Sequence, residues 1–310
     1  MPDIAPPGIL VIKLGALGDF VQAFGAFAAI RKHHDKQKIT LLTTPPFGEF
    51  AKASGYFDTV CTDGRPATLD IAGWLRLRHF LRGGGYGRVY DLQTSGRSSF
   101  YYRLFWPGPR REWSGIAKGC SHPHANPERD RMHTVERQAE QLSMAGIKEI
   151  TPPDLGWATA DISGFGLSER YALLAPGGAA HRPGKRWPAG RFGELAQILT
   201  GKNIQPVLVG ATDEAPMMAA ICDICPDALG LAGKTTLLDL AALGRGAVLC
   251  VGNDTGPMHL LSAVGCRSVV VYSDQSDPAL CGQRGRDVTI LRRDALSSLA
   301  VSDVVDALGV

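Results

Sequence analysis

The sequence predicts an α/β protein made of two doubly wound halves, each built around a parallel sheet. Short apolar runs alternate with helix-like segments, which is the pattern of repeated strand, helix, strand units. The alternation pauses after residue 146, in a stretch rich in Gly, Pro and Asp, and restarts near residue 171. A chain of 310 residues is also longer than one ordinary hydrophobic core serves. We therefore expect domains at residues 1–150 and 170–310, joined by a linker at residues 151–169.

The first half begins with the strand GILVIK at residues 8–13, followed by a helical segment at residues 19–34. Further strands are expected at residues 38–42 and 87–92. In the second half, the expected strands are residues 171–176, 204–210, 246–252, 267–273 and 287–291. The expected helices between them are residues 190–199, 214–222, 236–244 and 256–265. Ligands bind beyond the carboxyl ends of the strands in such sheets, so the loops after residues 13, 176 and 252 are where chemistry is expected.

The composition excludes several classes of protein. With 45% hydrophobic and 20% charged residues, the chain has the apolar content of a folded protein and lacks the polarity of a disordered one. Lys13, Asp19 and Gln22 interrupt the most apolar N-terminal stretch, so no membrane-spanning helix is expected. The first residues, MPDIAPPG, lack the basic start and apolar run of a signal peptide. Seven scattered cysteines do not suggest a disulfide framework, and we expect a cytoplasmic protein.

Positive charge is concentrated between Trp74 and Glu136, although the net charge of the chain is only +3. Eleven Lys and Arg stand there against five acids, a local balance of +6, together with ten of the 23 aromatic residues. The basic residues are Arg76, Arg78, Arg82, Arg88, Arg97, Arg103, Arg110, Arg111, Lys118, Arg129 and Arg131. This basic aromatic segment suggests a surface for an anionic, partly apolar partner. The alternative is a solvated helix face whose aromatics belong to the core.

The first loop, GALGD, leads directly into a helix and contains Gly15, Gly18 and Asp19. It is not a GxGxxG fingerprint, and Thr rather than an acid follows the second strand, so the loop gives little support to a dinucleotide site. Asp19 could cap the helix N-terminus, since Asp is among the preferred capping residues. A carboxylate at this position could instead take a proton from a substrate hydroxyl.

The segment VGNDTGPMHL, residues 251–260, follows another expected strand. Thr255 and Gly256 open a helix whose free N–H groups and positive dipole end favour a phosphate. His259 comes four residues after Thr255 and therefore lies on the same helix face. It could point at the same anion, or it could be an ordinary core histidine.

The segment PGGAAHRPGKRWP, residues 176–188, places Lys185 and Arg186 between a glycine loop and a helix expected to begin near Pro188. A cation there could neutralise a diphosphate leaving group, although a basic loop is often only solvated. Glu214 begins the next expected helix. It could cap that helix or accept two hydrogen bonds from ribose hydroxyls.

No metal site is expected. Cys222 and Cys225 form a single CxxC, and His122 and His124 form an HxH without a nearby set of further ligands. One zinc site needs about four convergent ligands. The chain also has no GxSxG nucleophile elbow and no P-loop.

Taken in order, six segments resemble the heptosyltransferases of lipopolysaccharide core synthesis, glycosyltransferase family 9. They are ILVIKLGALGD, YDLQTSGRSS, APGGAAHRPGKRWPAGRFGELA, LVGATDE, LAGKTTLLDLAAL and VGNDTGPMHLLSAVG. The resemblance runs from about Ile9 to Pro278 and is most specific at NDTGPMH and the preceding LAGKTTLLDLAAL. It implies a GT-B fold, with two Rossmann-like domains facing each other across a cleft. The acceptor would bind to residues 1–150 and the nucleotide-sugar to residues 170–310. Family members transfer heptose from ADP-heptose with inversion and without a required metal or other cofactor.

The resemblance also implies roles for individual residues. Asp19 corresponds to the catalytic base, Lys185 to the cation on the donor phosphates and Glu214 to the acid that binds the ribose. The other expected donor contacts are Gly18, Asp254, Thr255, Gly256 and His259. Gly15 and Ala16 stand where many members carry small hydroxylated residues, which leaves the identity of the sugar and the acceptor open.

The predicted function is therefore an inverting glycosyltransferase that moves heptose from ADP-heptose onto an anionic glycolipid of the lipopolysaccharide-core type. The basic aromatic segment would contact this acceptor at the inner membrane surface, with Arg97, Arg110 and Arg111 as candidate contacts and no role for nucleic acid. A nucleotide-sugar epimerase of similar fold is one alternative, and it would act without an acceptor. A non-catalytic nucleotide-sugar or glycan-binding protein is the other.

Overall fold

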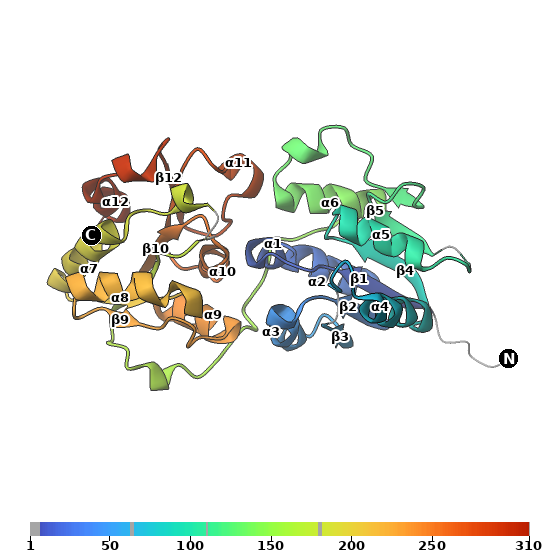
Figure 1. The fold of residues 1–310 in the computed structure, drawn as a ribbon, viewed down its shortest axis with the longest axis horizontal. Coiled ribbons are helices and arrows are strands. Elements are labelled where there is room, and N and C mark those ends of the chain that lie inside the picture. Colours follow the sequence, from blue (N-terminus) through green and yellow to red (C-terminus); the bar gives the residue numbers. More distant parts are fainter. Residues whose placement is uncertain (1–6, 63–64, 110, 179–181, 310) are drawn as a thin grey trace. The chain divides into compact units, whose positions relative to one another are not determined.

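The computed structural model describes residues 7–62, 65–109, 111–178 and 182–309 (Figure 1). The chain divides into two compact units, Met1–Pro153 (unit 1) and Asp154–Val310 (unit 2). The segment expected as a linker falls mostly in unit 2 and packs there. Leu155 and Ala158 are buried, and their carbonyl oxygens accept hydrogen bonds from the guanidinium of Arg245.

Unit 1 is built on a parallel six-stranded sheet with the strand order β3-β2-β1-β4-β5-β6. Its strands are β1 (Gly8–Ile12), β2 (Ile39–Leu42), β3 (Thr59–Cys61), β4 (Tyr86–Asp91), β5 (Glu112–Gly115) and β6 (His122–Pro123). The apolar run of β1 is buried because this strand lies between β2 and β4, with Ile12 in register with Leu42 and Asp91. The loop after β1 therefore begins at the middle of the sheet's carboxyl edge.

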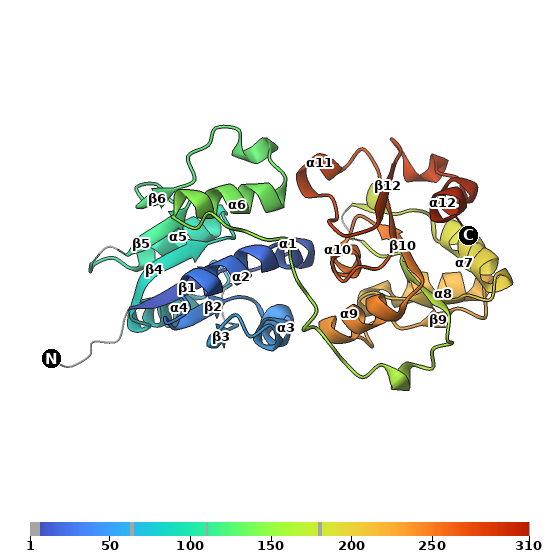
Figure 2. The ribbon, with the colours of Figure 1, turned by 180° about the vertical axis from the view of Figure 1, so that it is seen from behind.

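The helices of unit 1 cover both faces of this sheet (Figures 1 and 2). They are α1 (Leu17–Gln22), α2 (Phe24–His33), α3 (Gly48–Ala53), α4 (Ile71–Gly83), α5 (Gly96–Leu104) and α6 (Thr134–Met144). Helix α4 packs beside α5, where the ring of Trp74 meets that of Phe100 edge-on at 5.4 Å between centroids. Helix α6 packs beside α1 and α2. Right-handed crossovers place these two groups on opposite faces of the sheet.

Unit 2 repeats the plan, with the strand order β12-β11-β10-β7-β8-β9 in a second parallel sheet. Its strands are β7 (Tyr171–Ala175), β8 (Gln205–Leu208), β9 (Leu229–Gly230), β10 (Leu249–Asn253), β11 (Ser268–Tyr272) and β12 (Val288–Arg292). Its helices are α7 (Ala189–Gly201), α8 (Ala215–Ile224), α9 (Leu237–Gly246), α10 (Gly256–Ala263), α11 (Pro278–Cys281) and α12 (Val301–Leu308). Counted from its own first strand, each sheet has the order 3-2-1-4-5-6 of a Rossmann-like fold.

The expected strands and helices are all present, and the α/β fold class is confirmed. One correction concerns residues 19–34, which form two helices, because the first helix ends at Gln22 and Ala23 separates it from α2. The strands that the sequence did not predict, β3, β5, β6 and β9, have two to four residues each. Such short strands near the sheet edges have no clear apolar period. Among the described residues, no helix is long and apolar enough to cross a membrane.

Candidate functional site

In each sheet the order in which successive strands are added reverses once, between the first and the fourth strand of that sheet. These switch points lie between β1 and β4 in unit 1 and between β7 and β10 in unit 2. The loops on either side of a switch point lead away in opposite directions, which opens a crevice at the carboxyl ends of the two strands. Asp19 follows β1, and Lys185 and Asp254 follow β7 and β10, whereas Glu214 follows the neighbouring strand β8.

In unit 1, Asp19 lies in the first turn of α1, three residues after the N-cap Ala16. The alternative that Asp19 is the N-cap is therefore wrong. Its side chain is half-buried, and the positive charges of Lys13 and Arg137 act on it from β1's loop and from α6. Gly18, next to it, is buried in the same turn. The carboxylate thus lies in the helix that follows the sheet's carboxyl edge, where two cations act on it.

A second carboxylate, Asp91, ends β4 on the other side of the switch point. Its Oδ1 accepts hydrogen bonds from the backbone N–H groups of Gln93 and Thr94 at 3.1 and 3.0 Å. Complete burial raises its pKa to about 6, against the opposing effects of these bonds and of Lys13. Lys13 is itself buried and donates from Nζ to the carbonyl of Leu92 at 3.1 Å. Burial lowers the pKa of Lys13, and the charges of Asp19 and Asp91 oppose that change.

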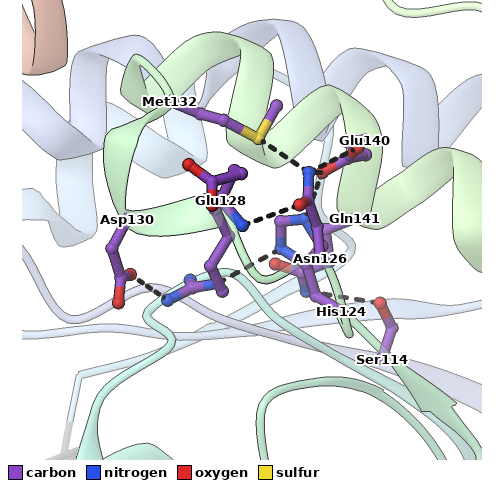
Figure 3. Close-up of polar contacts among 9 residues, drawn as sticks. Ser114, His124, Asn126, Glu128, Asp130, Met132, Glu140 and Gln141 are labelled. Carbon is purple, nitrogen blue, oxygen red and sulfur yellow. Dashed lines mark hydrogen bonds and ion pairs between the residues drawn. The ribbon is translucent and has the colours of Figure 1, made fainter.

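His124, the second histidine of the HxH motif, belongs to the polar network shown in Figure 3. His124 is buried, and its Nε2 lies 2.7 Å from a carboxylate oxygen of Glu140 on α6. The Nε of Arg129 donates to Nδ1 at 3.4 Å, which assigns the ring proton to Nε2. Asn126 donates to both oxygens of Glu140, and hydrogen bonds from His124 and Asn126 lower the pKa of this carboxyl. The network ties the loop after β6 to α6, the helix that carries Arg137.

The arginines proposed as acceptor contacts have different surroundings. Arg97 lies over the ring of Trp74, 5.6 Å from its centroid, and donates to the carbonyl of Pro66 at 2.9 Å. Arg111 is half-buried and lines a cavity of about 600 Å³ beside α5. Arg110 lies outside the described residues. The cavity is also lined by the cations Arg103 and Lys118 and by the aromatics Phe100, Tyr102, Phe105 and Trp106.

In unit 2, Lys185 and Asp254 form an ion pair at the switch point. Their Nζ and Oδ2 atoms are 2.6 Å apart, and their side chains are only 15% and 7% exposed. Burial by itself would raise the pKa of Asp254, but the Lys185 ammonium outweighs it and leaves that pKa below its ordinary value. Gln283 donates to the other carboxylate oxygen at 3.3 Å. The structure thus joins two residues that the sequence places 69 positions apart.

Asp254 leads directly into α10, whose N-cap is Thr255. The Thr255 hydroxyl donates to the carbonyl of Asn253 and makes no capping bond. Pro257, the second residue of the helix, has no N–H, so the N–H groups of Gly256 and Met258 are the ones at this end that could bind an anion. Gly256 is the first residue of this helix. His259, one turn later, is buried.

Glu214 is held against the loop that follows β7. Its two carboxylate oxygens accept the backbone N–H groups of Gly178 at 2.8 Å and Ala211 at 2.9 Å. A Cβ at Gly177 or at Gly210 would displace this carboxylate from its present position. Each carboxylate oxygen has a second lone pair, so Glu214 can still accept a hydroxyl. The interpretation of Glu214 as a cap of α8 is wrong, because its side chain makes no capping bond to that helix and instead accepts the N–H of Ala211 before the 3₁₀ turn Thr212–Glu214. Ligand binding by Glu214 stays a prediction.

Three further residues shape the same region: Arg186, which sequence analysis named together with Lys185, and Asn253 and Gln283, to which it assigned no role. Asn253 accepts the N–H of Trp187 at 2.8 Å and donates to the carbonyl oxygens of Pro176 and Gly177, so it joins the two loops at the switch point. Arg186 donates to the carbonyl of Gly178, and its buried Nε has no partner among the described residues. Gln283 contacts Asp254 from a distant loop. Arg186 belongs to the KR dipeptide at residues 185–186, and Asn253 begins the NDTG motif. Gln283 lies in no motif that would link it to either residue.

Cys222 and Cys225 are free thiols. In the part of the chain that the structure describes, no three His, Cys, Asp or Glu side chains are grouped as metal ligands would be.

Comparison with known proteins agrees with the fold and the motifs. The model of glycosyltransferase family 9 (heptosyltransferase) matches residues 74–301, well over half of the chain. Lipooligosaccharide heptosyltransferase 2 of Haemophilus influenzae is 31% identical over 115 residues, which are 36% of this chain and 33% of that protein. The alignment therefore spans about a third of the relative's own length.

Two solved structures show the same architecture across both units. The glycosyl transferase family 9 protein from Veillonella parvula has a TM-score of 0.85 and 19% identity, covering 99% of this chain and 97% of that one. The E. coli heptosyltransferase WaaC with ADP has a TM-score of 0.76 and 21% identity, covering 97% and 98%. The expected GT-B fold is confirmed by these likenesses.

Proposed function

Because the chain belongs to glycosyltransferase family 9, we propose that it is an inverting glycosyltransferase that moves heptose from ADP-heptose onto a glycolipid of the lipopolysaccharide-core type. The observation that carries the proposal is the arrangement at the β7/β10 switch point. There the Lys185–Asp254 pair, the open N-terminus of α10 and the Glu214 carboxylate lie on adjoining loops. The name of the H. influenzae relative and the ADP complex of WaaC support the same donor and acceptor classes.

Unit 2 would hold the donor. The diphosphate would accept hydrogen bonds from the free N–H groups that follow Thr255 and from the ammonium of Lys185. Asp254 holds that ammonium in place before the donor arrives. Glu214 would accept the ribose hydroxyls with its remaining lone pairs, and Gly256 allows close approach of the backbone. His259, one turn further along α10, would contact the same diphosphate.

Unit 1 would supply the base. In the proposed displacement, an acceptor hydroxyl oxygen attacks the anomeric carbon as the bond between that carbon and the diphosphate oxygen breaks. The bonding electrons leave with ADP, whose charge the groups of unit 2 stabilise. Asp19 takes the proton of the hydroxyl as the general base, and the positive charges of Lys13 and Arg137 act on its carboxylate. A single displacement of this kind inverts the configuration of the sugar.

The acceptor's phosphates or acidic sugars would be bound by the basic aromatic segment. The cavity beside α5 offers Arg103, Arg111 and Lys118 together with four aromatic side chains. Such a surface suits a ligand that is anionic in part and apolar in part. Arg97, which lies over the ring of Trp74 next to Phe100, would also contact the acceptor.

The proposal is tested by following ADP release from ADP-heptose with and without a core glycolipid that lacks the heptose. We expect release only when the acceptor is present, and a product whose anomeric configuration, determined by NMR, is opposite to that of the donor. Loss of ADP-heptose without acceptor, with a new epimer in the spectrum, would show an epimerase instead. Donor binding without any turnover would show a binding protein.

A further inference from the structure

Large apolar side chains are concentrated on one outer face of unit 1. Nine such side chains are strongly exposed in the described part of the chain, and five of them lie at or between α4 and the loop after α5. These five, the α4/α5 apolar face, are Leu69 (90% exposed), Ile71 (73%), Leu75 (59%), Phe100 (43%) and Trp106 (76%). The other four are scattered over the remaining helices and one loop. Exposed apolar side chains gathered in this way mark an interaction surface.

Contacts between the two helices join these side chains into one surface. Ile71 and Leu75 are one turn apart on α4, and Arg78 and Arg82 continue the same stripe. Arg78 donates to the carbonyl of Trp106 at 3.1 Å, so the loop after α5 lies against this stripe. A second contact, between the rings of Phe100 on α5 and Trp74 on α4, holds the two helices together.

The charges around the face are positive. Arg78, Arg82 and Arg103 stand on the same two helices, within the segment of net charge +6. The nearest acid, Asp70, caps α4 by accepting the N–H of Gly73 at 2.7 Å and lies 3.8 Å from Arg76, so its charge is largely compensated. A basic border also disfavours a second copy of the chain as occupant, since like charges would meet.

We propose that the α4/α5 apolar face docks unit 1 onto the surface of an anionic phospholipid bilayer. Ile71, Leu75 and Trp106 would enter the boundary between headgroups and acyl chains, and the arginines would contact lipid phosphates. A helix with apolar side chains on one face and arginines beside them, next to an exposed tryptophan, has the chemistry of an interfacial anchor. This surface would be separate from the groups at the β1/β4 switch point, and its binding would require no donor. It deepens the proposed function, because a glycolipid acceptor resides in such a bilayer.

The test is co-sedimentation of the full chain with vesicles, without sugar nucleotide. Vesicles of phosphatidylcholine alone are compared with vesicles that also contain phosphatidylglycerol. We expect binding to the anionic vesicles, weakened at high salt, and a loss of at least about tenfold in the partition coefficient for Ile71→Glu/Leu75→Glu. Met144→Glu, at an exposed apolar position on α6, is the matched control and should bind as the wild type does.

A second measurement reports on the tryptophan directly. Anionic vesicles should shift the tryptophan emission of the wild type to shorter wavelength, and Trp106→Phe should remove most of that shift. Equal binding of the Ile71→Glu/Leu75→Glu variant and the wild type would overturn the proposal, and so would absence of wild-type binding. Concentration-dependent dimerisation that the same double variant abolishes, without vesicle binding, would overturn it in favour of a second copy. Because no turnover is measured, each result is independent of whether the chain transfers heptose.

Discussion

The ion pair between Lys185 and Asp254 allows a sharp test of the donor site. Replacing Lys185 with alanine removes the ammonium that lies 2.6 Å from a carboxylate of which only 7% is exposed. Burial then acts on Asp254 without a cation, and the carboxylate is stabilised by the neutral side chains of Tyr272, Ser276 and Gln283. The variant therefore leaves a buried carboxylate without its counter-ion beside the N-terminus of α10.

The expected loss of unfolding free energy follows from how far the two side chains are buried. Breaking a fully buried pair by removing one partner costs about 3–5 kcal/mol. Because 15% of the Lys185 side chain is exposed, we expect roughly 2–3 kcal/mol of lost unfolding free energy. For ADP, the loss of a charge-assisted hydrogen bond is worth about 1–3 kcal/mol, which corresponds to a roughly 5- to 150-fold higher Kd.

The pH dependence of stability should also change sign. In the wild type the pKa of Asp254 is lowered by Lys185, so its contribution to stability is present above the ordinary carboxyl pKa and is lost as pH falls through the lower folded value. In Lys185→Ala, burial should raise the pKa of Asp254 above its unfolded value. The variant should then be most stable at low pH and lose stability as pH rises through the acidic range.

The assay combines calorimetry with ADP and chemical denaturation at several pH values. Lys185→Ala/Asp254→Asn should recover much of the lost stability, because the buried charge is gone, but it should not restore ADP affinity. Lys202→Ala, at an exposed position in unit 2, is the control and should change neither quantity. Unchanged ADP affinity and unchanged stability in Lys185→Ala would refute the argument.

Three further predictions concern unit 1. Asp19→Asn should lower kcat by roughly 10²-fold or more while ADP affinity stays the same, and Asp35→Asn, at an exposed position, serves as its control; a wild-type rate would leave Asp19 without a catalytic role. Arg103→Ala/Arg111→Ala should raise the acceptor KM but not the donor KM and reduce the salt dependence of acceptor kinetics, because screening acts over about 8–10 Å at physiological ionic strength; equal salt dependence would contradict this role. The pKa of Asp91 in the folded protein, about 6, exceeds the ordinary value of 3.8. The free energy of unfolding should therefore fall by about 3 kcal/mol as pH rises from 3.8 to about 6, because ionisation of Asp91 is favoured in the unfolded chain. Denaturation of Asp91→Asn should show that this slope is lost, and an unchanged slope would assign it to another group.

The fold was predictable wherever the chain carries long periodic patterns. The apolar run of β1 and the helices from α7 to α10 were all expected from local sequence. The strands that were missed are short and partly exposed, so hydrogen bonds to a neighbouring strand decide their conformation more than their own residues do. The division of residues 19–34 into two helices was likewise invisible, since the apolar pattern continues through Ala23.

Much of the candidate site was also visible in the sequence, because loops after strands end at a common sheet edge. Asp19, Lys185 and Glu214 could each be singled out from their place after an expected strand. Their partners could not. Asp254 pairs with Lys185 across 69 residues, and Gln283 approaches from a loop with no motif.

The sequence by itself therefore determined the α/β class, the two halves and the loops for which ligand binding is proposed, because these depend on apolar periodicity and on glycines near strand ends. Only the tertiary structure decided which side chains meet. It decided that His124 binds Glu140, that Asp91 is buried enough to hold a proton near pH 6, and that α4 and α5 present one apolar face. The physical reason is that burial and long-range pairing depend on how distant segments pack, and local sequence does not specify that packing.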